Sequence, residues 1–407
     1  MKKKVVITGM GIWSCIGTSL DEVRDSLYYG RSGIILSQQR KEAGFRSSLV
    51  GNVPPADLKP YIPRNLRHFM PEEAQYAYMA TRQALEQAGI DEDYLNSHEV
   101  GVIYGNDSAA EANMVALDKF RTAGSTAACG SGAIFQSMNS NITMNLACLF
   151  HLRGINLTTS AACASGSQSI GLAAMLIREG LQECVVCGGA EENNMYGIAA
   201  FDGIQAFSTR ESDPKKASRP FDAGRDGLVP SGGAATVVVE SYESAVRRGA
   251  PILAEVVSWG FSGNGDHIST PNVEGPARSL ELCLQEGHIA ASEVGYINAH
   301  ATSTIIGDQR EALAIARVFG ERSVPVTSTK GQTGHEMWMA GASEIVYSTL
   351  MMQNDFIAGN LNFEHPDEVT ACLNIIPETC HNHFDMFVSN SFGFGGTNSS
   401  LLIRRII

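Results

Sequence analysis

The sequence predicts an α/β protein made of two related halves, which pack as alternating helix and sheet layers in an αβαβα architecture. Short apolar runs typical of buried strands alternate with longer helical segments along all 407 residues. The order strand, small-residue turn, helix also occurs in both halves of the chain, at 155–177 and at 324–351. Two copies of such a unit predict two halves related by a pseudo-two-fold axis.

Other segments support this internal repeat. Three further pairs match between the halves: the helical segments 74–89 and 275–287, the strands 184–190 and 387–396, and the strands 5–11 and 254–260. Each of the two helical segments leads to Glu-Val-Gly and a strand. The repeat period of about 200 residues is far longer than that of a solenoid. A polar helix near 240–249 separates an N-terminal half, 1–250, from a C-terminal half, 251–407.

The composition excludes several classes of protein. Hydrophobic residues make up 44% of the chain and charged residues 18%, which is ordinary for a globular protein. The net charge of −13, without a basic tract beyond the N-terminal lysines, disfavours nucleic acid as a partner. No apolar run approaches the roughly 18 residues of a membrane span. We recognise no targeting segment, so we expect a cytoplasmic protein.

The cysteines do not predict a disulfide framework or a metal site. Nine cysteines in a chain of this length show no secreted disulfide pattern. Cys184 and Cys187 form a CxxC, but they flank Val185 and Val186 in an apolar run typical of a strand. Residues three apart on a strand point to opposite faces, and no second CxxC or histidine pair is nearby. We therefore expect no bound metal.

Cys163 is the first candidate for a reactive residue. It falls between the strand-like run 155–159 and a helix-like run that begins at Ala164, among small residues that leave room for a substrate. A helix N-terminus carries unpaired N–H groups and a partial positive charge, which favour the nucleophilic thiolate. A buried structural cysteine is the alternative for this turn taken alone.

Two histidines occupy equivalent loops that the repeat brings towards Cys163. His300 follows the strand at 294–298, and His335 follows the strand near 324–327. A cysteine beside two imidazoles suits covalent acyl chemistry, and imidazole N–H groups can stabilise an oxyanion. Lys330 and Glu344 flank His335; they are expected to form either an ordinary ion pair or a support that orients this histidine.

The glycine-rich segment 393–398 is not a nucleotide-binding loop by its sequence. It lacks the Gly-Lys-Ser/Thr ending of phosphate loops, and the glycines at 11 and 17 do not have dinucleotide-binding spacing. The glycines of 393–398 more plausibly allow unusual backbone angles and close approach of a substrate.

Taken together, these segments resemble the β-ketoacyl-acyl-carrier-protein synthases of the thiolase superfamily. The resemblance runs essentially end to end and is closest to the elongating synthases I and II. It includes Val-Ile-Thr-Gly-Met-Gly-Ile at the N-terminus and the segments 30–34, 219–227 and 390–398. The ordered set of cysteine, histidine, lysine, histidine and Gly-Phe-Gly-Gly is specific, although no single member is.

The resemblance implies a thiolase-like fold and a decarboxylative condensation that extends a fatty acyl chain. Cys163 would accept an acyl group, and malonyl-carrier protein would then lose carbon dioxide with the help of the two histidines. Backbone N–H groups of Cys163 and Phe394 would form an oxyanion hole, with Phe394 also gating the pocket. The implied catalytic residues are Cys163, His300, His335, Lys330, Glu344 and Phe394, and the implied substrate-binding residues are Thr302, Thr304, Phe392 and Met138.

The resemblance also implies partners. Arg64 and Arg67 match the family's docking position for the acyl carrier protein, which would let an acidic enzyme meet an acidic partner. Malonyl and acyl thioesters are the implied substrates. No dissociable cofactor is implied, because the phosphopantetheine arrives on the carrier protein. Thr302 and Thr304 would bind that arm, and a homodimer is expected.

Three departures from the family pattern leave the pathway open. Ala301 follows His300 where glycine is usual, and Glu336, Met337, Trp338 and Met339 follow His335 where small residues are usual. The segment 105–110 also replaces a glycine-rich stretch. A ketosynthase of a specialised polyene or polyketide pathway, paired with a chain-length-factor-like subunit, is therefore the alternative to fatty-acid elongation.

Other members of the superfamily fit the sequence less well. A degradative thiolase would carry a second cysteine where Phe394 stands, and an initiating synthase would carry asparagine in place of His335. A non-catalytic chain-length subunit would lack Cys163.

Overall fold

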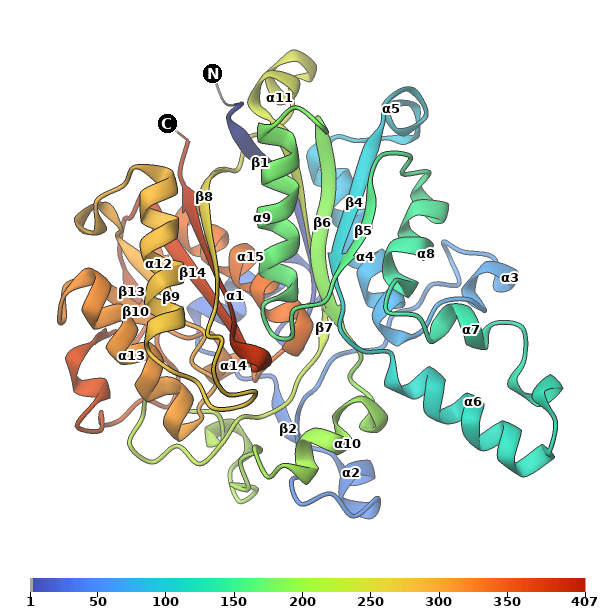
Figure 1. Cartoon of the computed structure of the whole chain (residues 1–407), viewed down its shortest axis with the longest axis horizontal. Helices are drawn as coiled ribbons and strands as arrows, with labels where there is room; N and C mark the ends of the chain where they lie inside the picture. The colour runs from blue at the N-terminus through green and yellow to red at the C-terminus, as the bar shows by residue number, and fades with distance from the viewer. Residues whose placement is uncertain (1–2, 407) are drawn as a thin grey trace.

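The centre of the fold is one eleven-stranded sheet, which a computed structural model describes together with the rest of residues 3–406 (Figure 1). Across the sheet the strands are β12 (Asn374–Ile375), β10 (Pro325–Thr327), β9 (Tyr296–Asn298), β14 (Met386–Gly393), β15 (Thr397–Arg404), β8 (Ala254–Gly263), β1 (Val5–Trp13), β7 (Gly233–Ser241), β6 (Cys184–Glu191), β4 (Val100–Gly105) and β5 (Asn156–Thr159).

The two halves of the sheet have the same topology in mirror order. In one half β5, β4 and β6 are parallel, and β7 and β1 follow as antiparallel neighbours. In the other half β10, β9 and β14 are parallel, and β15 and β8 follow. The halves join where β1 pairs with β8, with Val6 opposite Glu255. This arrangement confirms the predicted two-fold repeat. The two halves of the sheet meet where β1 and β8 pair.

Two helices lie between the halves, and the others cover the outside. The central helices α9 (Ser165–Arg178) and α15 (Ala340–Gln353) contact each other, and each contacts strands of both halves. The outer helices α4 (Glu72–Ala88) and α12 (Glu274–Gly287) pack on β1 and β8, respectively, and α13 (Ile305–Phe319) packs on α12. The layers therefore alternate as αβαβα, as the sequence predicts.

The apolar strands explain why these layers form. All eight residues of β6 are buried, because α4 covers one face of the sheet and α9 covers the other. Cys184 packs in the core cluster that contains Ala77 of α4, whereas Cys187 packs in the cluster that contains Ile170 of α9. The two cysteines of the CxxC thus lie on opposite faces, as expected for a strand.

The remaining elements surround this core. They are α1 (Leu20–Tyr28), α2 (Gln38–Glu42), α3 (Arg64–Arg67), α5 (Glu92–Ser97), α6 (Ala110–Ala123), α7 (Ala133–Gln136), α8 (Asn141–Phe150), α10 (Met195–Gly203), α11 (Tyr242–Arg248), α14 (Lys330–Thr333), β2 (Ile34–Leu36), β3 (Leu49–Gly51), β11 (Phe356–Ile357) and β13 (Cys380–His381). Helix α6 extends away from the body of the molecule (Figure 1). Across residues 3–406, no helix combines the length and the apolar character needed to cross a membrane.

Candidate active site

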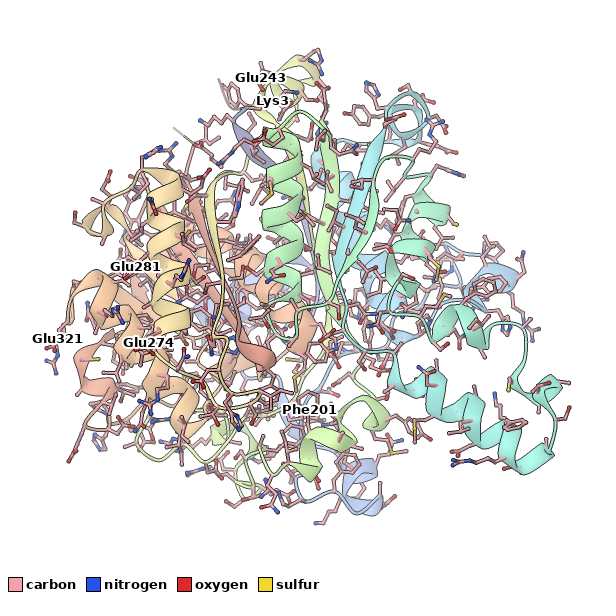
Figure 2. The ribbon with its side chains drawn as sticks, viewed as in Figure 1. Lys3, Phe201, Glu243, Glu274, Glu281 and Glu321 are labelled. Atoms are coloured by element: carbon pink, nitrogen blue, oxygen red, sulfur yellow. The ribbon has the colours of Figure 1, made fainter. Side chains whose placement is uncertain are left out.

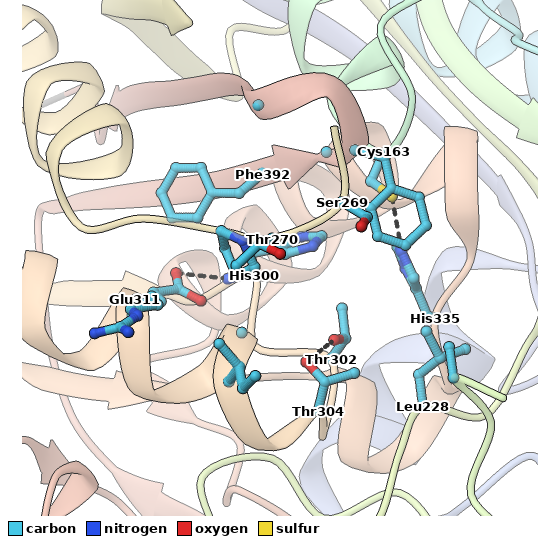
Figure 3. A pocket seen from close by; sticks show the side chains of 18 of the residues that line it. Cys163, Leu228, Ser269, Thr270, His300, Thr302, Thr304, Glu311, His335 and Phe392 are labelled. Atoms are coloured by element: carbon cyan, nitrogen blue, oxygen red, sulfur yellow. Dashed lines mark hydrogen bonds between the residues drawn. The ribbon is translucent and has the colours of Figure 1, made fainter. Parts of the chain in front are cut away.

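Three loops from the ends of parallel strands bring Cys163, His300 and His335 together. Cys163 follows β5, His300 follows β9, and His335 follows β10 and the short α14. The cysteine sulfur and a ring nitrogen of each histidine all lie within 4.8 Å of one another. The Nε2 atom of His335 is 3.0 Å from the Sγ atom of Cys163 (Figure 3). The repeat therefore predicted this convergence correctly.

The turn that carries Cys163 has a constrained backbone. Cys163 lies one residue before Ala164, the N-cap of α9. Its neighbour Ala162 has a φ of 49°, in the left-handed region that costs a non-glycine residue about 1–2 kcal/mol. The Ala162 N–H donates to a carboxylate oxygen of Asp107 at 3.0 Å, which holds this conformation. The strained turn thus points the sulfur out of the helix end and into the site.

Opposing influences act on the ionisation of the Cys163 thiol. Cys163 is 7% exposed, and burial raises the pKa of its thiol to about 12. Lys330 and the backbone N–H groups of Cys163 and Phe394 act in the opposite direction but do not outweigh burial. Burial therefore works against the thiolate that the helix N-terminus favours, because a charged sulfur would lose hydration. A base must take the proton when the thiol reacts.

The two imidazoles are available in their neutral forms. Burial lowers the pKa of both His300 and His335 well below the usual value of 6.5, and the nearby Lys330 lowers each of them further. A neutral imidazole can accept a proton at one nitrogen and donate a hydrogen bond from the other. His335 can therefore act as the base for Cys163, and the His300 ring lies edge-on to it at a centroid distance of 5.3 Å.

Glu311 of α13 fixes the loop of His300, a role that the sequence did not reveal. Its two carboxylate oxygens accept the backbone N–H groups of His300 at 2.9 Å and Ala301 at 2.7 Å. Asn390 of β14 donates to the same carboxylate at 3.1 Å. Glu311 is buried and eleven residues from His300, so no local motif signals the contact.

Lys330 and Glu344 form a buried ion pair behind the histidines. The Nζ atom of Lys330 donates to Glu344, and both side chains are almost completely buried. The pair leaves Lys330 as a positive charge that acts on Cys163, His300 and His335 alike. Lys330 thus influences the whole site electrostatically, which goes beyond an ordinary surface ion pair.

A second carboxylate anchors the chain just after His335, and it too was not assigned a role from sequence. Glu336 accepts hydrogen bonds from Ser14 at 2.9 Å, Tyr347 at 2.8 Å and Ser343 at 2.5 Å. Ser14 directly follows β1, and Ser343 and Tyr347 lie in α15, so the network ties the loop to both halves. The loop that carries His335 is therefore held rigidly in place.

A cavity of about 520 Å³ leads from the surface to Cys163. Its lining includes His300, His335 and the predicted substrate-binding residues Thr302, Thr304 and Phe392 (Figure 3). The hydroxyl oxygens of Thr302 and Thr304 are 3.1 Å apart. Phe394 also lines the cavity, is 41% exposed, and stacks on Phe201 of α10 at a centroid distance of 6.2 Å.

Three residues of the predicted site lie away from this cavity. Met138 is 42% exposed just after α7 and is not among the cavity-lining residues. Arg64 and Arg67 are on α3, where they line a separate shallow depression with His68 and Phe69. The structure of the single chain therefore brings together around one cavity the predicted residues Cys163, His300, His335, Thr302, Thr304, Phe392 and Phe394, with Lys330 and Glu344 paired behind the histidines, but not Met138.

Comparisons with known proteins agree with this architecture. The family model described as Beta-ketoacyl synthase, N-terminal domain, matches residues 2–245, and the one described as the C-terminal domain matches residues 253–364. The chain is 40% identical to 3-oxoacyl-[acyl-carrier-protein] synthase 1 of Escherichia coli over 407 residues, 99% of each chain. It is 35% identical to 3-oxoacyl-[acyl-carrier-protein] synthase 2 of Vibrio harveyi over 419 residues, covering 100% of this chain and 99% of the relative.

Solved structures of similar proteins also agree with this architecture. A crystal structure of a β-ketoacyl synthase from Burkholderia phymatum superimposes with a TM-score of 0.95 at 37% identity, covering 100% of both chains. The ishigamide ketosynthase/chain length factor superimposes with a TM-score of 0.92 at 28% identity, again over 100% of both chains. With family models that match both halves and relatives that match end to end, the chain belongs to the β-ketoacyl synthase family.

Proposed function

We propose that this chain is an acyltransferase that condenses malonyl-carrier protein with a Cys163-bound acyl group and so elongates a fatty acyl chain. The observation that carries the proposal is the contact between Cys163 Sγ and His335 Nε2, with His300 beside them in one buried cavity. The relatives named as synthases 1 and 2 of 3-oxoacyl-carrier protein have higher sequence identity than the ketosynthase of the ishigamide system. That ranking favours fatty-acid elongation over the specialised polyene or polyketide pathway.

In the first half-reaction the thiol attacks the carbonyl carbon of an acyl thioester. As the new C–S bond forms, the thiol proton moves to His335 Nε2, 3.0 Å away. The tetrahedral oxyanion is stabilised by the N–H groups of Cys163 and Phe394, both of which face the sulfur. When the old C–S bond breaks, the proton on His335 passes to the departing phosphopantetheine thiolate, and the imidazole is neutral again.

In the second half-reaction malonyl thioester occupies the same cavity. The bond to its carboxylate breaks, carbon dioxide leaves, and the electron pair forms an enolate whose oxygen accepts N–H donors from His300 and His335. Neutral imidazoles suit this role, and burial keeps their pKa values low. The enolate carbon then attacks the acyl carbonyl on Cys163. The sulfur leaves as a thiolate and takes up one proton from solvent, which regenerates the resting thiol.

The direct test is a condensation assay. We expect purified protein, given acyl-carrier protein and malonyl-carrier protein, to release one carbon dioxide for each β-ketoacyl-carrier protein formed. Mass spectrometry of the carrier and capture of labelled carbon dioxide measure the two products independently. Carbon dioxide release without β-ketoacyl product, or neither product, would contradict the proposal.

We further propose that the carrier protein docks at Arg64 and Arg67 and delivers its own phosphopantetheine, so that no dissociable cofactor is needed. Arg64 is exposed on α3, and an acidic partner requires such a local basic surface on a chain of net charge −13. Thr302 and Thr304 would then hydrogen-bond the phosphopantetheine arm within the cavity. The location proposed for the reaction is the cytoplasm.

Charge reversal tests the docking surface. The double variant Arg64→Glu and Arg67→Glu is expected to raise the KM for acyl-carrier protein about tenfold or more at low salt, because two attractive charges become repulsive. The kcat with saturating carrier should change much less. The matched control is the double variant Arg317→Glu and Arg322→Glu. These two arginines lie at the end of α13 and just after it, in the other half of the chain. An unchanged KM in the double variant at 64 and 67 would rule out this docking position.

We also propose that two copies of the chain associate through the projecting α6–α7 region. Its exposed apolar side chains are Met114, Leu117, Phe120, Ile134, Phe135 and Met138. Contiguous exposed apolar surface of this kind marks an interface in a water-exposed protein. Such a dimer would cover Met138, which a single chain leaves exposed.

A further inference from the structure

Large buried side chains fill the space beside Cys163. Cys163 packs in a buried cluster whose other members are Ile198, Phe207, Leu228, Met337 and Trp338. Met337 is 1% exposed and Trp338 is 7% exposed. An acyl group on the sulfur must find its room next to these residues.

Met337 and Trp338 occupy different positions relative to the open cavity. Met337 lines the cavity together with Cys163 and His335, whereas Trp338 is absent from its lining and lies behind it in the cluster. Thr302, Thr304 and Phe392 line the same cavity, where the proposed carrier arm would enter. Trp338 packs against Cys163 and Met337 outside the open cavity, so an acyl tail that extended from the sulfur into this cluster would meet its indole.

The backbone of Trp338 is held tightly. The preceding Glu336 is anchored by Ser14, Ser343 and Tyr347, and α15 begins two residues after Trp338. The carbonyl oxygen of Trp338 sits so close to β6 that a Cβ added at Gly189 would lie 2.5 Å from it. Met337 adopts a left-handed φ of 45°, a conformation that a non-glycine residue keeps only when its surroundings enforce it.

The indole ring is also fixed from the side of α10. Phe201, which lies on α10 (Figure 2), contacts Trp338 at a centroid distance of 6.2 Å. Phe201 in turn stacks between Phe207 and Phe394 with ring planes within 15° of each other. The Nε1 donor of Trp338 has no hydrogen-bond partner among the described residues. A hydrocarbon tail packed against this ring has no hydrogen-bond acceptor for that donor. Displacement of the ring by the tail would therefore form no compensating hydrogen bond.

We propose that Trp338, supported by Met337, closes the acyl-binding space beside Cys163 and restricts the enzyme to short acyl groups. The inference rests on the proposed condensation and specifies its substrate class. A long acyl tail would have to displace a ring that packed neighbours hold on both sides, and tightly packed interiors resist added volume. A short acyl group needs no such displacement.

Acylation of Cys163 by carriers of different chain length tests the proposal without requiring the condensation step. Butyryl-, octanoyl- and lauroyl-carrier protein are each incubated with the enzyme, and the acyl-enzyme is followed by intact-protein mass spectrometry. We expect the wild-type chain to be acylated by butyryl-carrier protein about tenfold or more faster than by lauroyl-carrier protein. Equal rates for all three lengths would overturn the proposal.

A graded series at Trp338 shows whether this residue sets the limit. Trp338→Phe, Trp338→Leu and Trp338→Ala should lower the butyryl-to-lauroyl ratio step by step, until alanine accepts both with rates within about threefold. The intermediate variants retain the readout if alanine disrupts folding. The matched control is Trp259→Leu on β8, whose indole contacts Arg178 and not the site, and this variant should keep the wild-type ratio.

The outcomes separate this inference from the proposed function. Folded variants with an unchanged ratio would overturn the role of Trp338 while leaving the condensation reaction intact. Acylation by none of the carriers would overturn both. Acylation with length selection but no β-ketoacyl product in the condensation assay would contradict the proposed function while supporting the role of Trp338.

Discussion

Replacing Cys163 with alanine is expected to abolish acyl-enzyme formation and to reduce condensation by at least about a thousandfold, since no other group can take up the acyl chain. Release of carbon dioxide from malonyl-carrier protein should remain measurable, because His300 and His335 stay in place. The acyl adduct is located by peptide mass spectrometry, and carbon dioxide release is followed with labelled malonyl-carrier protein.

The matched control for this prediction is Cys372→Ala. Cys372 is a half-buried free cysteine whose thiol faces the backbone carbonyl of Ala312, outside the cavity. This variant should be acylated like the parent chain. Persistent acylation of the Cys163→Ala protein would show that a different residue is the nucleophile.

Replacing His335 with alanine is expected to slow carbon dioxide release about a hundredfold or more, because one of the two donors to the enolate oxygen is lost. Acylation of Cys163 should slow as well, since His335 Nε2 is the base that lies 3.0 Å from the sulfur. His300→Ala should impair decarboxylation but affect acylation less. Equal effects of the two variants on acylation would contradict this division of roles.

The pH dependence of decarboxylation follows from the same geometry. Burial and Lys330 lower the pKa of both histidines well below 6.5, so both are already neutral at that pH. The rate should therefore stay constant between pH 6.5 and 8 and fall only on acidification through the lowered pKa values, where the rings become charged. A half-maximal rate close to pH 6.5 would show that the imidazoles titrate normally. The control is His98→Ala, an exposed histidine of the outer surface.

The sequence predicts those parts of the site that local patterns determine. A strand that stops at small residues before an apolar helix sets the turn of Cys163, and the structure begins α9 at Ser165, one residue from the predicted start. The repeat then predicted that the loops of His300 and His335 lie beside this turn, because equivalent strand ends meet at a pseudo-two-fold axis. Both predictions depend on hydrophobic periodicity and on the order of strands and helices, and both can be recognised in the sequence.

Other features depend on contacts between distant segments, and sequence patterns do not reveal those. Glu311 supports the loop of His300 from α13, and Glu336 accepts hydrogen bonds from Ser14, just after β1, and from α15, so neither has a local signal. The ionisation of Cys163 depends on distant segments in the same way. The helix terminus is visible in the sequence, but the burial that raises the pKa of Cys163 is not. Met138 lies outside the cavity of a single chain, a placement that no local pattern reveals.

By itself the sequence determined the αβαβα class, the two-fold repeat, the family and which cysteine and histidines meet in the cavity. Hydrophobic periodicity and the positions of glycines are properties of the local sequence, so they can be recognised without a structure. Only the tertiary structure revealed the burial that raises the pKa of Cys163, the carboxylates that hold the histidine loops, and the packing of Trp338 beside Cys163. These depend on desolvation and packing, which arise only when segments far apart in the chain exclude water together.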